Sequence, residues 1–149
     1  MLDLLIFSVD EHYYALPIVK VVHVIWALEI TPIAHSPKIV CGVFDLHGTM
    51  IPVVSFRSLF SLPEKTLEIE DTLILVELHG HQIALLCDHI IGVFALNVEE
   101  AIEDQTIFSE FLITQVVKYE DRLIPLLDID TLIGHEMTML NTVDGRKHE

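Results

Sequence analysis

The sequence predicts an all-β fold built from two small antiparallel β-barrels that share an apolar contact. Short apolar segments of about six to eight residues, rich in Val, Ile and Leu, recur between turn signals along the chain. Hydrophobic residues make up 52% of the 149 positions, and the mean hydropathy is +0.53. The order of segments in the first half also returns in the second, which indicates a duplicated unit.

The first strands are expected at Leu4–Val9 and Tyr13–Pro17, separated by a turn over Asp10, Glu11 and His12. The same plan returns at Leu73–Leu78 and Gln82–Leu86, with His79-Gly80-His81 as the turn. Further strands are expected at Gly42–His47, Met50–Phe56, Leu112–Tyr119 and Leu123–Leu127. Short helical turns are expected at Pro37–Val40, Arg57–Phe60 and Asp128–Ile133.

Two offsets relate the halves. A shift of about 69 positions places Leu4–Phe7 on Leu73–Val76 and Val24 on Val93, and a shift of about 73 places Ile51–Val54 on Ile124–Leu127. Because a half of about 70 residues would bury only a marginal core, the halves are expected to pack together. We therefore predict one domain over residues 1–149, with lobes near 12–70 and 72–127 completed by terminal strands and helices. The polar, acidic stretch 62–71 is the predicted connector.

The charge balance and the apolar runs exclude several classes of partner. A net charge of −15 disfavours binding to nucleic acid or to anionic membrane surfaces, and it fits either solubility or attraction to a basic partner. The longest apolar runs, 16–28 and 83–98, are interrupted by charged or histidine residues and are too short to span a membrane. Asp3 is an acid where a signal peptide needs a basic region, so we expect no export signal. We expect a cytoplasmic protein whose cysteines, Cys41 and Cys87, are reduced and buried.

Catalytic and metal sites are not expected. The 6 glycines are well separated, which excludes a phosphate-binding loop, and the 9 histidines form no spaced four-ligand set. Asp128 and Asp130 are interpreted as acids at a helix start, and the acidic run over 99–104 as a solvated surface. We therefore expect no enzyme activity, no cofactor and no metal. Trp26 is either a core residue or an exposed aromatic of an interface.

Four segments together resemble the CheW family of chemotaxis coupling proteins. They are Tyr14–Val21, Ala34–Val54, Ile83–Val93 and Arg122–Asp128, and the resemblance extends from about Leu4 to Ile133. It implies two five-stranded SH3-like barrels related by pseudo-twofold symmetry. It also implies an adaptor that binds the regulatory domain of a CheA-type histidine kinase at its open barrel ends. A groove between the lobes would take the helical tip of a chemoreceptor.

By the same resemblance, the receptor groove would involve Val21, His23, Val43, Asp45, His47 and Gly48. Three of these positions depart from the family pattern. Asp45-Leu46-His47-Gly48 stands where the family has Asn-Leu-Arg-Gly, and His23 stands where it has an acid. Neutral histidine has one donor and one acceptor, whereas arginine offers a charged planar fork of donors.

The predicted function is thus an adaptor with a divergent receptor groove, serving flagellar chemotaxis, pilus motility or another kinase array. In the alternative, the chain has lost receptor coupling and binds another partner, a metal or a small ligand. The Asp45 and His47 pair, which would point the same way on one strand, motivates that alternative.

Overall fold

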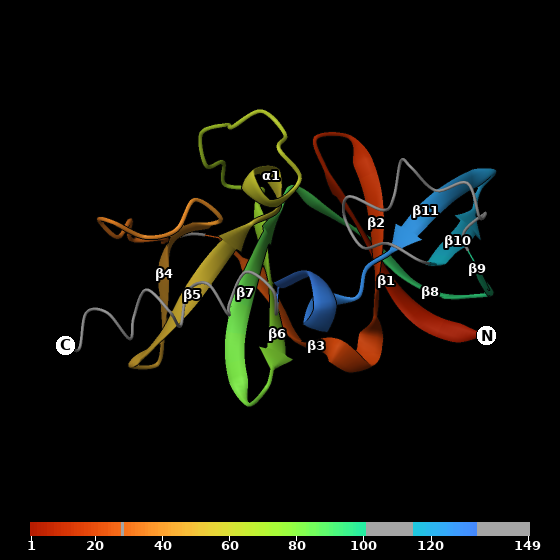
Figure 1. The fold of residues 1–149 in the computed structure, drawn as a ribbon, viewed down its shortest axis with the longest axis horizontal. Helices are drawn as coiled ribbons and strands as arrows, with labels where there is room; N and C mark the ends of the chain where they lie inside the picture. Colours follow the sequence, from red (N-terminus) through yellow and green to blue (C-terminus); the bar gives the residue numbers. More distant parts are fainter. Residues whose placement is uncertain (28, 101–114, 134–149) are drawn as a thin grey trace.

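The computed structural model describes residues 1–27, 29–100 and 115–133, and most of their regular structure is β-strand (Figure 1). One sheet has six strands, in the spatial order β8 (His89–Leu96), β1 (Leu2–Val9), β2 (His12–Pro17), β11 (Arg122–Leu126), β10 (Gln115–Tyr119) and β9 (Val98–Glu100). The other has five, in the order β3 (Val21–Trp26), β6 (Thr72–Leu78), β7 (His81–Cys87), β5 (Thr49–Ser55) and β4 (Val40–Leu46). The predicted all-β class with two strand-rich lobes is confirmed.

Each sheet combines strands from both halves of the chain. The β1–β2 hairpin pairs with β8 on one side and with β11 on the other, while the β6–β7 hairpin pairs with β3 and β5. The lobe ranges expected at 12–70 and 72–127 therefore do not coincide with the two sheets, because the two halves exchange these central hairpins.

The strand registers confirm the internal repeat. Leu5 pairs with Leu16 in the first central hairpin, and Ile74 pairs with Leu85 at the matching place in the second. The parallel pairs repeat as well. Leu126 of β11 lies beside Ala15 of β2, and Val53 of β5 lies beside Ala84 of β7. Each pair maps onto its counterpart by the two offsets seen in the sequence, so the sheets are built on one plan.

Four hairpins close with two-residue loops of the same type. Both loop residues have positive φ in each of them, which is the geometry of the type I′ turn that matches strand twist. The loops are Asp10-Glu11, His47-Gly48, His79-Gly80 and Glu120-Asp121. Glycine occupies the second loop position in two of the four. The first position of every loop, and the second position of the other two loops, hold a non-glycine residue in the left-handed region.

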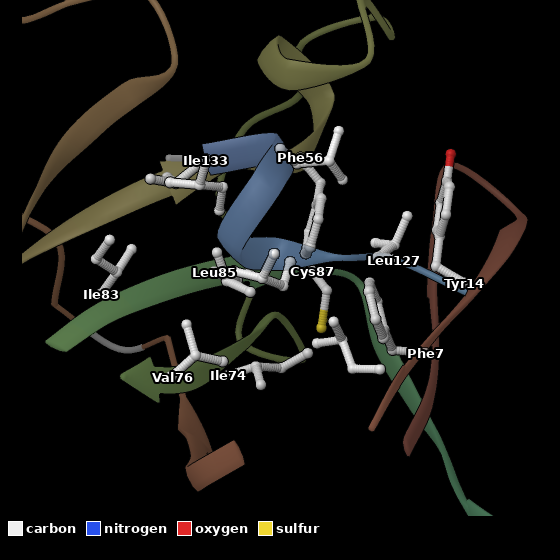
Figure 2. Close-up of a cluster of buried hydrophobic side chains, with 14 of the residues drawn as sticks. Phe7, Tyr14, Phe56, Ile74, Val76, Ile83, Leu85, Cys87, Leu127 and Ile133 are labelled. Atoms are coloured by element: carbon white, nitrogen blue, oxygen red, sulfur yellow. The ribbon is translucent and has the colours of Figure 1, made fainter. Parts of the chain in front are cut away.

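Three apolar clusters fill the molecule. Two of them each take most of their side chains from one sheet. One lies around Leu4 and Ile6 of the six-stranded sheet, and the other lies around Leu73 and Leu75 of the five-stranded sheet. The third and largest lies between the sheets and takes side chains from both (Figure 2). Its residues include Phe7, Tyr14, Phe56, Phe60, Ile74, Val76, Ile83, Leu85, Cys87, Leu127 and Ile133. The apolar contact expected between the lobes is this shared cluster.

Each sheet rolls up without a closing ladder among the described strands. In the six-stranded sheet, the edge strands β8 and β9 are separated only by Asn97, so the chain itself joins the two edges. In the five-stranded sheet, the segment after β3 crosses to the opposite edge, where Thr31 bridges Val43. Gly42 permits that crossing, since a Cβ there would lie 2.4 Å from the Thr31 carbonyl oxygen.

Helical structure in the described residues is confined to short pieces. They are η1 (Ile18–Lys20), α1 (Phe56–Leu59) and residues 129–133. The helical turn expected at Pro37–Val40 is wrong, because this stretch makes a single turn, closed by a hydrogen bond from the Val40 N–H to the Pro37 carbonyl, and Val40 already belongs to β4. None of the helices in the described ranges is long and apolar enough to cross a bilayer.

Some expected features lie outside the residues that the structure describes, and the expected burial of one cysteine is wrong. Residues 112–114 of one expected strand, Glu103, Asp104 and the tail from 134 to 149 lie outside the described residues. The expectation for Cys41 is wrong, since this cysteine is exposed at the edge strand β4, whereas Cys87 is buried as expected. Both cysteines are free thiols.

Candidate functional site

A groove of about 780 Å³ runs between the two sheets, at the edge strands β3 and β8. Its lining is mainly apolar and comes from both lobes: Leu5, Ile18, Val24, Ile25, Trp26, Glu70, Thr72, His89, Ile90 and Val93. Because β3 and β8 each pair with a neighbour on one side only, both are edge strands next to the groove. Such an apolar surface between two lobes is typical of a protein-binding site.

The repeat explains why valines lie on both walls. Val24 pairs with Ile74 and Val93 pairs with Leu5, and both partners belong to the cluster between the sheets. Directly paired residues share a sheet face, so both valines lie on the face that looks toward the other lobe. They are the two residues that the sequence offset of about 69 placed together, and both are exposed.

Trp26 is the largest exposed side chain of the groove. Its exposed fraction is 62%, and it ends β3 beside Thr72, so it is not a core residue. A large aromatic left in solvent beside other exposed apolar side chains is the kind of residue that dominates protein–protein binding energy. This observation excludes the core alternative that the sequence left open for Trp26.

Ion pairs hold the beginning of each groove strand. Arg57 in α1 donates from Nη2 to Oδ2 of Asp88, the residue before β8, at 2.6 Å. Lys20 at the end of η1, immediately before β3, donates from Nζ to Oδ2 of Asp130 at 2.9 Å. Arg57 and Asp130 occupy matching places in the repeat at the offset of 73, whereas Lys20 corresponds to His89 and not to Asp88 at the offset of 69.

The six residues assigned by resemblance do not converge in this groove. Val21 packs against the cluster between the sheets. His23 pairs with Leu75, so it lies on the face of β3 that looks into the five-stranded lobe. Val43 and Asp45 alternate with Phe44, which packs in that interior, and so point outward from β4. β3 and β4 are the opposite edges of their sheet.

The structure does bring Asp45, His47 and Gly48 together in one turn. The Gly48 N–H donates to Oδ1 of Asp45 at 2.8 Å, so the Asp45 carboxylate holds the β4–β5 turn closed. His47 lines a second cleft of about 660 Å³, together with His81 from the neighbouring β6–β7 hairpin. Among the residues that the structure describes, no three His, Cys, Asp or Glu side chains are grouped to hold a metal ion.

Sequence reasoning missed part of the groove. Glu70, His89 and Ile90 were not assigned to a groove, because the connector and the strand β8 carry no local motif that indicates one. The match of Val24 with Val93 in the sequence repeat was the one signal that indicated a residue on each wall of the groove. Burial raises the pKa of Tyr14 to about 12 and also raises the pKa of the Cys87 thiol, so both groups keep their protons to a higher pH than they would in water.

Comparisons with known proteins agree with this architecture. The model of the CheW-like domain matches residues 3–137. The chemotaxis protein CheW of Thermotoga maritima is 30% identical over 134 residues, covering 88% of this chain and 87% of that protein. The CheW of Bacillus subtilis is 25% identical over 136 residues, covering 89% and 87%.

A solved structure shows the same fold. The scaffolding protein TtCheW from Thermoanaerobacter tengcongensis superposes with a TM-score of 0.78 and 25% sequence identity, covering 88% of this chain and 91% of that one. The family match spans both sheets, the shared core and the β3–β8 groove described above. The chain therefore belongs to the CheW-like domain family.

Proposed function

We propose that this protein is a non-catalytic adaptor that couples chemoreceptors to a CheA-type histidine kinase. The observation that carries this proposal is the exposed apolar groove between β3 and β8 on a fold shared with proteins named chemotaxis protein CheW. The solved relative is described as a scaffolding protein. An adaptor works by presenting surfaces, and this groove is a surface of the kind that binds a partner.

The groove suits the helical tip of a chemoreceptor. An amphipathic helix docks by placing apolar side chains, three or four residues apart, into an apolar groove. Val24 and Trp26 on one wall and Val93 on the other offer such a groove. The kinase regulatory domain would bind at the open ends of the rolled sheets, away from this groove. The adaptor would act on the cytoplasmic side of receptor arrays.

Binding of purified fragments tests the proposal. The full chain is expected to retain both a CheA regulatory domain and a receptor tip fragment. Val24→Glu and Trp26→Ala are expected to weaken tip binding at least tenfold, because they charge or truncate the groove wall. The matched control is Val19→Glu, whose side chain is 82% exposed and does not line the groove.

Three outcomes decide between the interpretations. If Val19→Glu binds the tip like the wild type while Val24→Glu does not, the groove is the receptor site. If all variants bind the tip equally, the receptor binds elsewhere on the molecule. If the wild type retains neither the tip nor the kinase fragment, the coupling function is wrong for this chain.

The six residues assigned by resemblance remain a proposal. Asp45, His47 and Gly48 lie in one exposed turn, so a receptor that binds there would contact a histidine in place of the family's arginine. We expect His47→Arg to strengthen receptor binding, because it adds a charged fork of donors. Calorimetry of the tip fragment measures this effect, and an unchanged affinity would place the turn outside the receptor contact.

A second candidate is a CheW-fold protein that binds a small ligand or a metal in place of a receptor. The observation behind it is the cleft that His47 shares with His81. Metal analysis of the purified protein and thermal melting with added zinc or nickel test it. A metal-free protein whose Tm does not change would remove the metal version of this candidate.

A further inference from the structure

The end of the connector forms part of the groove wall. Glu70 and Thr72 line the groove next to Trp26, and Ile69, which precedes Glu70, is 78% exposed. Ile69 is thus an exposed apolar side chain next in sequence to a lining residue, although it is not itself part of the groove lining. The connector joins β5 and α1 to β6, and it also supplies a surface of its own.

Hydrogen bonds fix this part of the connector in place. The carboxylate of Asp71 accepts from Lys65 Nζ at 2.7 and 2.8 Å and from the Glu68 N–H at 2.8 Å. The Asp71 carbonyl accepts the Ala27 N–H at 2.9 Å, and Thr72 pairs with Trp26. Because Asp71 is buried and fully engaged, its neighbour Glu70 is held next to the end of β3.

Among the described residues that line the groove, Glu70 is the only one with a carboxylate or a permanently charged side chain. Within the described residues its carboxylate has no ion-pair partner, whereas Lys65, the nearest lysine in sequence, is engaged by Asp71 and Glu68. The chain as a whole has 8 Lys and Arg residues against 23 Asp and Glu. A cation that neutralises Glu70 would therefore come from the partner.

We propose that Ile69 and Glu70 form a specificity-determining wall that selects a partner helix with a Lys or Arg next to its apolar stripe. The apolar stripe fills the space between Val24, Trp26 and Val93, the basic residue pairs with Glu70, and Ile69 covers the stem of that residue. This inference rests on the proposed function, since it states which helix the groove accepts. A helix with an acid at the same place is rejected by like charge.

Charge variants of Glu70 test the inference on the receptor tip fragment used above. We expect Glu70→Gln to weaken binding about threefold and Glu70→Lys about tenfold, with the largest loss at low salt. The matched control is Glu77→Lys, because Glu77 is exposed on β6, lies outside the groove lining, and changes the net charge equally. Ile69→Ser is expected to weaken binding without altering its salt dependence.

A charge swap identifies the partner residue. Single Lys or Arg residues of the tip fragment are changed to Glu, and one of these variants is expected to bind Glu70→Lys better than it binds the wild type. If Glu70→Lys and Glu77→Lys weaken binding to the same extent, the inference is overturned and the groove remains the receptor site. If the wild type does not bind the fragment at all, the proposed function fails, and the inference fails with it.

Discussion

The guanidinium of Arg57 joins the two lobes by donating to the carboxylate of Asp88 at 2.6 Å. The same Asp88 oxygen accepts the Asp10 N–H at 2.8 Å, and the Asp10 carboxylate lies 3.6 Å from Nη1 of Arg57. Arg57 Nη1 also donates to the Pro63 carbonyl, which ties the connector to the same point. One side chain thus connects α1, the connector, the β1–β2 turn and the start of β8.

Loss of this ion pair is expected to destabilise the fold. The side chains of Arg57 and Asp88 are only 12% and 16% exposed, so removing one leaves the other poorly solvated. We expect Asp88→Asn or Arg57→Met to lower the free energy of unfolding by about 2–4 kcal/mol. Urea unfolding measures this change. Lys20→Met is the control, because Lys20 and Asp130 are 46% and 40% exposed and such pairs contribute about 1 kcal/mol or less. Equal losses would contradict the interlobe role of Arg57.

The β1–β2 turn holds a strained residue. Glu11 has a φ of 66°, in the left-handed region that disfavours residues with a Cβ, and it is the second residue of a type I′ turn. We expect Glu11→Gly to raise the free energy of unfolding by about 0.5–1 kcal/mol. This value is what remains of the relieved strain after the cost of the greater freedom of glycine in the unfolded chain is subtracted. Gly80, at the matching place in the repeat, is the control: Gly80→Ala should have the opposite sign. A loss of stability in Glu11→Gly would contradict this geometry.

The crossing of the chain over β4 depends on Gly42. A Cβ at this position would lie 2.4 Å from the Thr31 oxygen and 2.7 Å from Cγ2 of Ile30. We expect Gly42→Ala to lower the free energy of unfolding by about 2–3 kcal/mol, since the backbone of the crossing segment has to move. Gly48→Ala is the comparison, because a Cβ there meets nothing within 4 Å and the cost of about 1 kcal/mol comes from φ alone. Chemical unfolding of both variants measures the difference.

Alkaline pH is expected to destabilise the protein through Tyr14. Burial raises the pKa of its phenol from 10.0 to about 12, so the folded state holds this proton more tightly than the unfolded state. The stability from this group is complete below pH 10 and is lost as the pH rises through 12. Tyr14→Phe keeps the ring stacked on Phe60, 5.0 Å away, and should flatten the fall of Tm between pH 9.5 and about 12. A Tm that falls equally in both proteins would show that other groups control alkaline unfolding.

Much of the fold was predictable from local pattern. The strands at Leu4–Val9 and Leu73–Leu78, the tight turns after them and the connector were located correctly, because a continuous apolar run bounded by turn residues is a local signal. Asp128 was correctly interpreted as a helix-start acid, since it accepts the Thr131 N–H at 3.3 Å. Ser55 caps α1 at the matching place by accepting the Ser58 N–H.

The errors come from edges and crossings. Pro37–Val40 was expected to be helical and Cys41 to be buried, yet Val40 begins an edge strand and Cys41 is exposed on that strand. An apolar run does not state whether its strand has a neighbour on both sides. The same uncertainty left Trp26 open between core and interface, and only its exposed position at the end of an edge strand excludes the core.

The sequence by itself determined the strand segments, their duplication and the family, because these depend on residue order and spacing. Tertiary structure alone decided which strands became neighbours: the central hairpins are exchanged between sheets, so β3 and β8 become edges that face one groove. It also decided that Glu70 stands in that groove, and that His23 and Asp45 lie on opposite edges of one sheet. The physical reason is that burial and electrostatic pairing depend on contacts between residues far apart in the chain, and local periodicity does not encode those contacts.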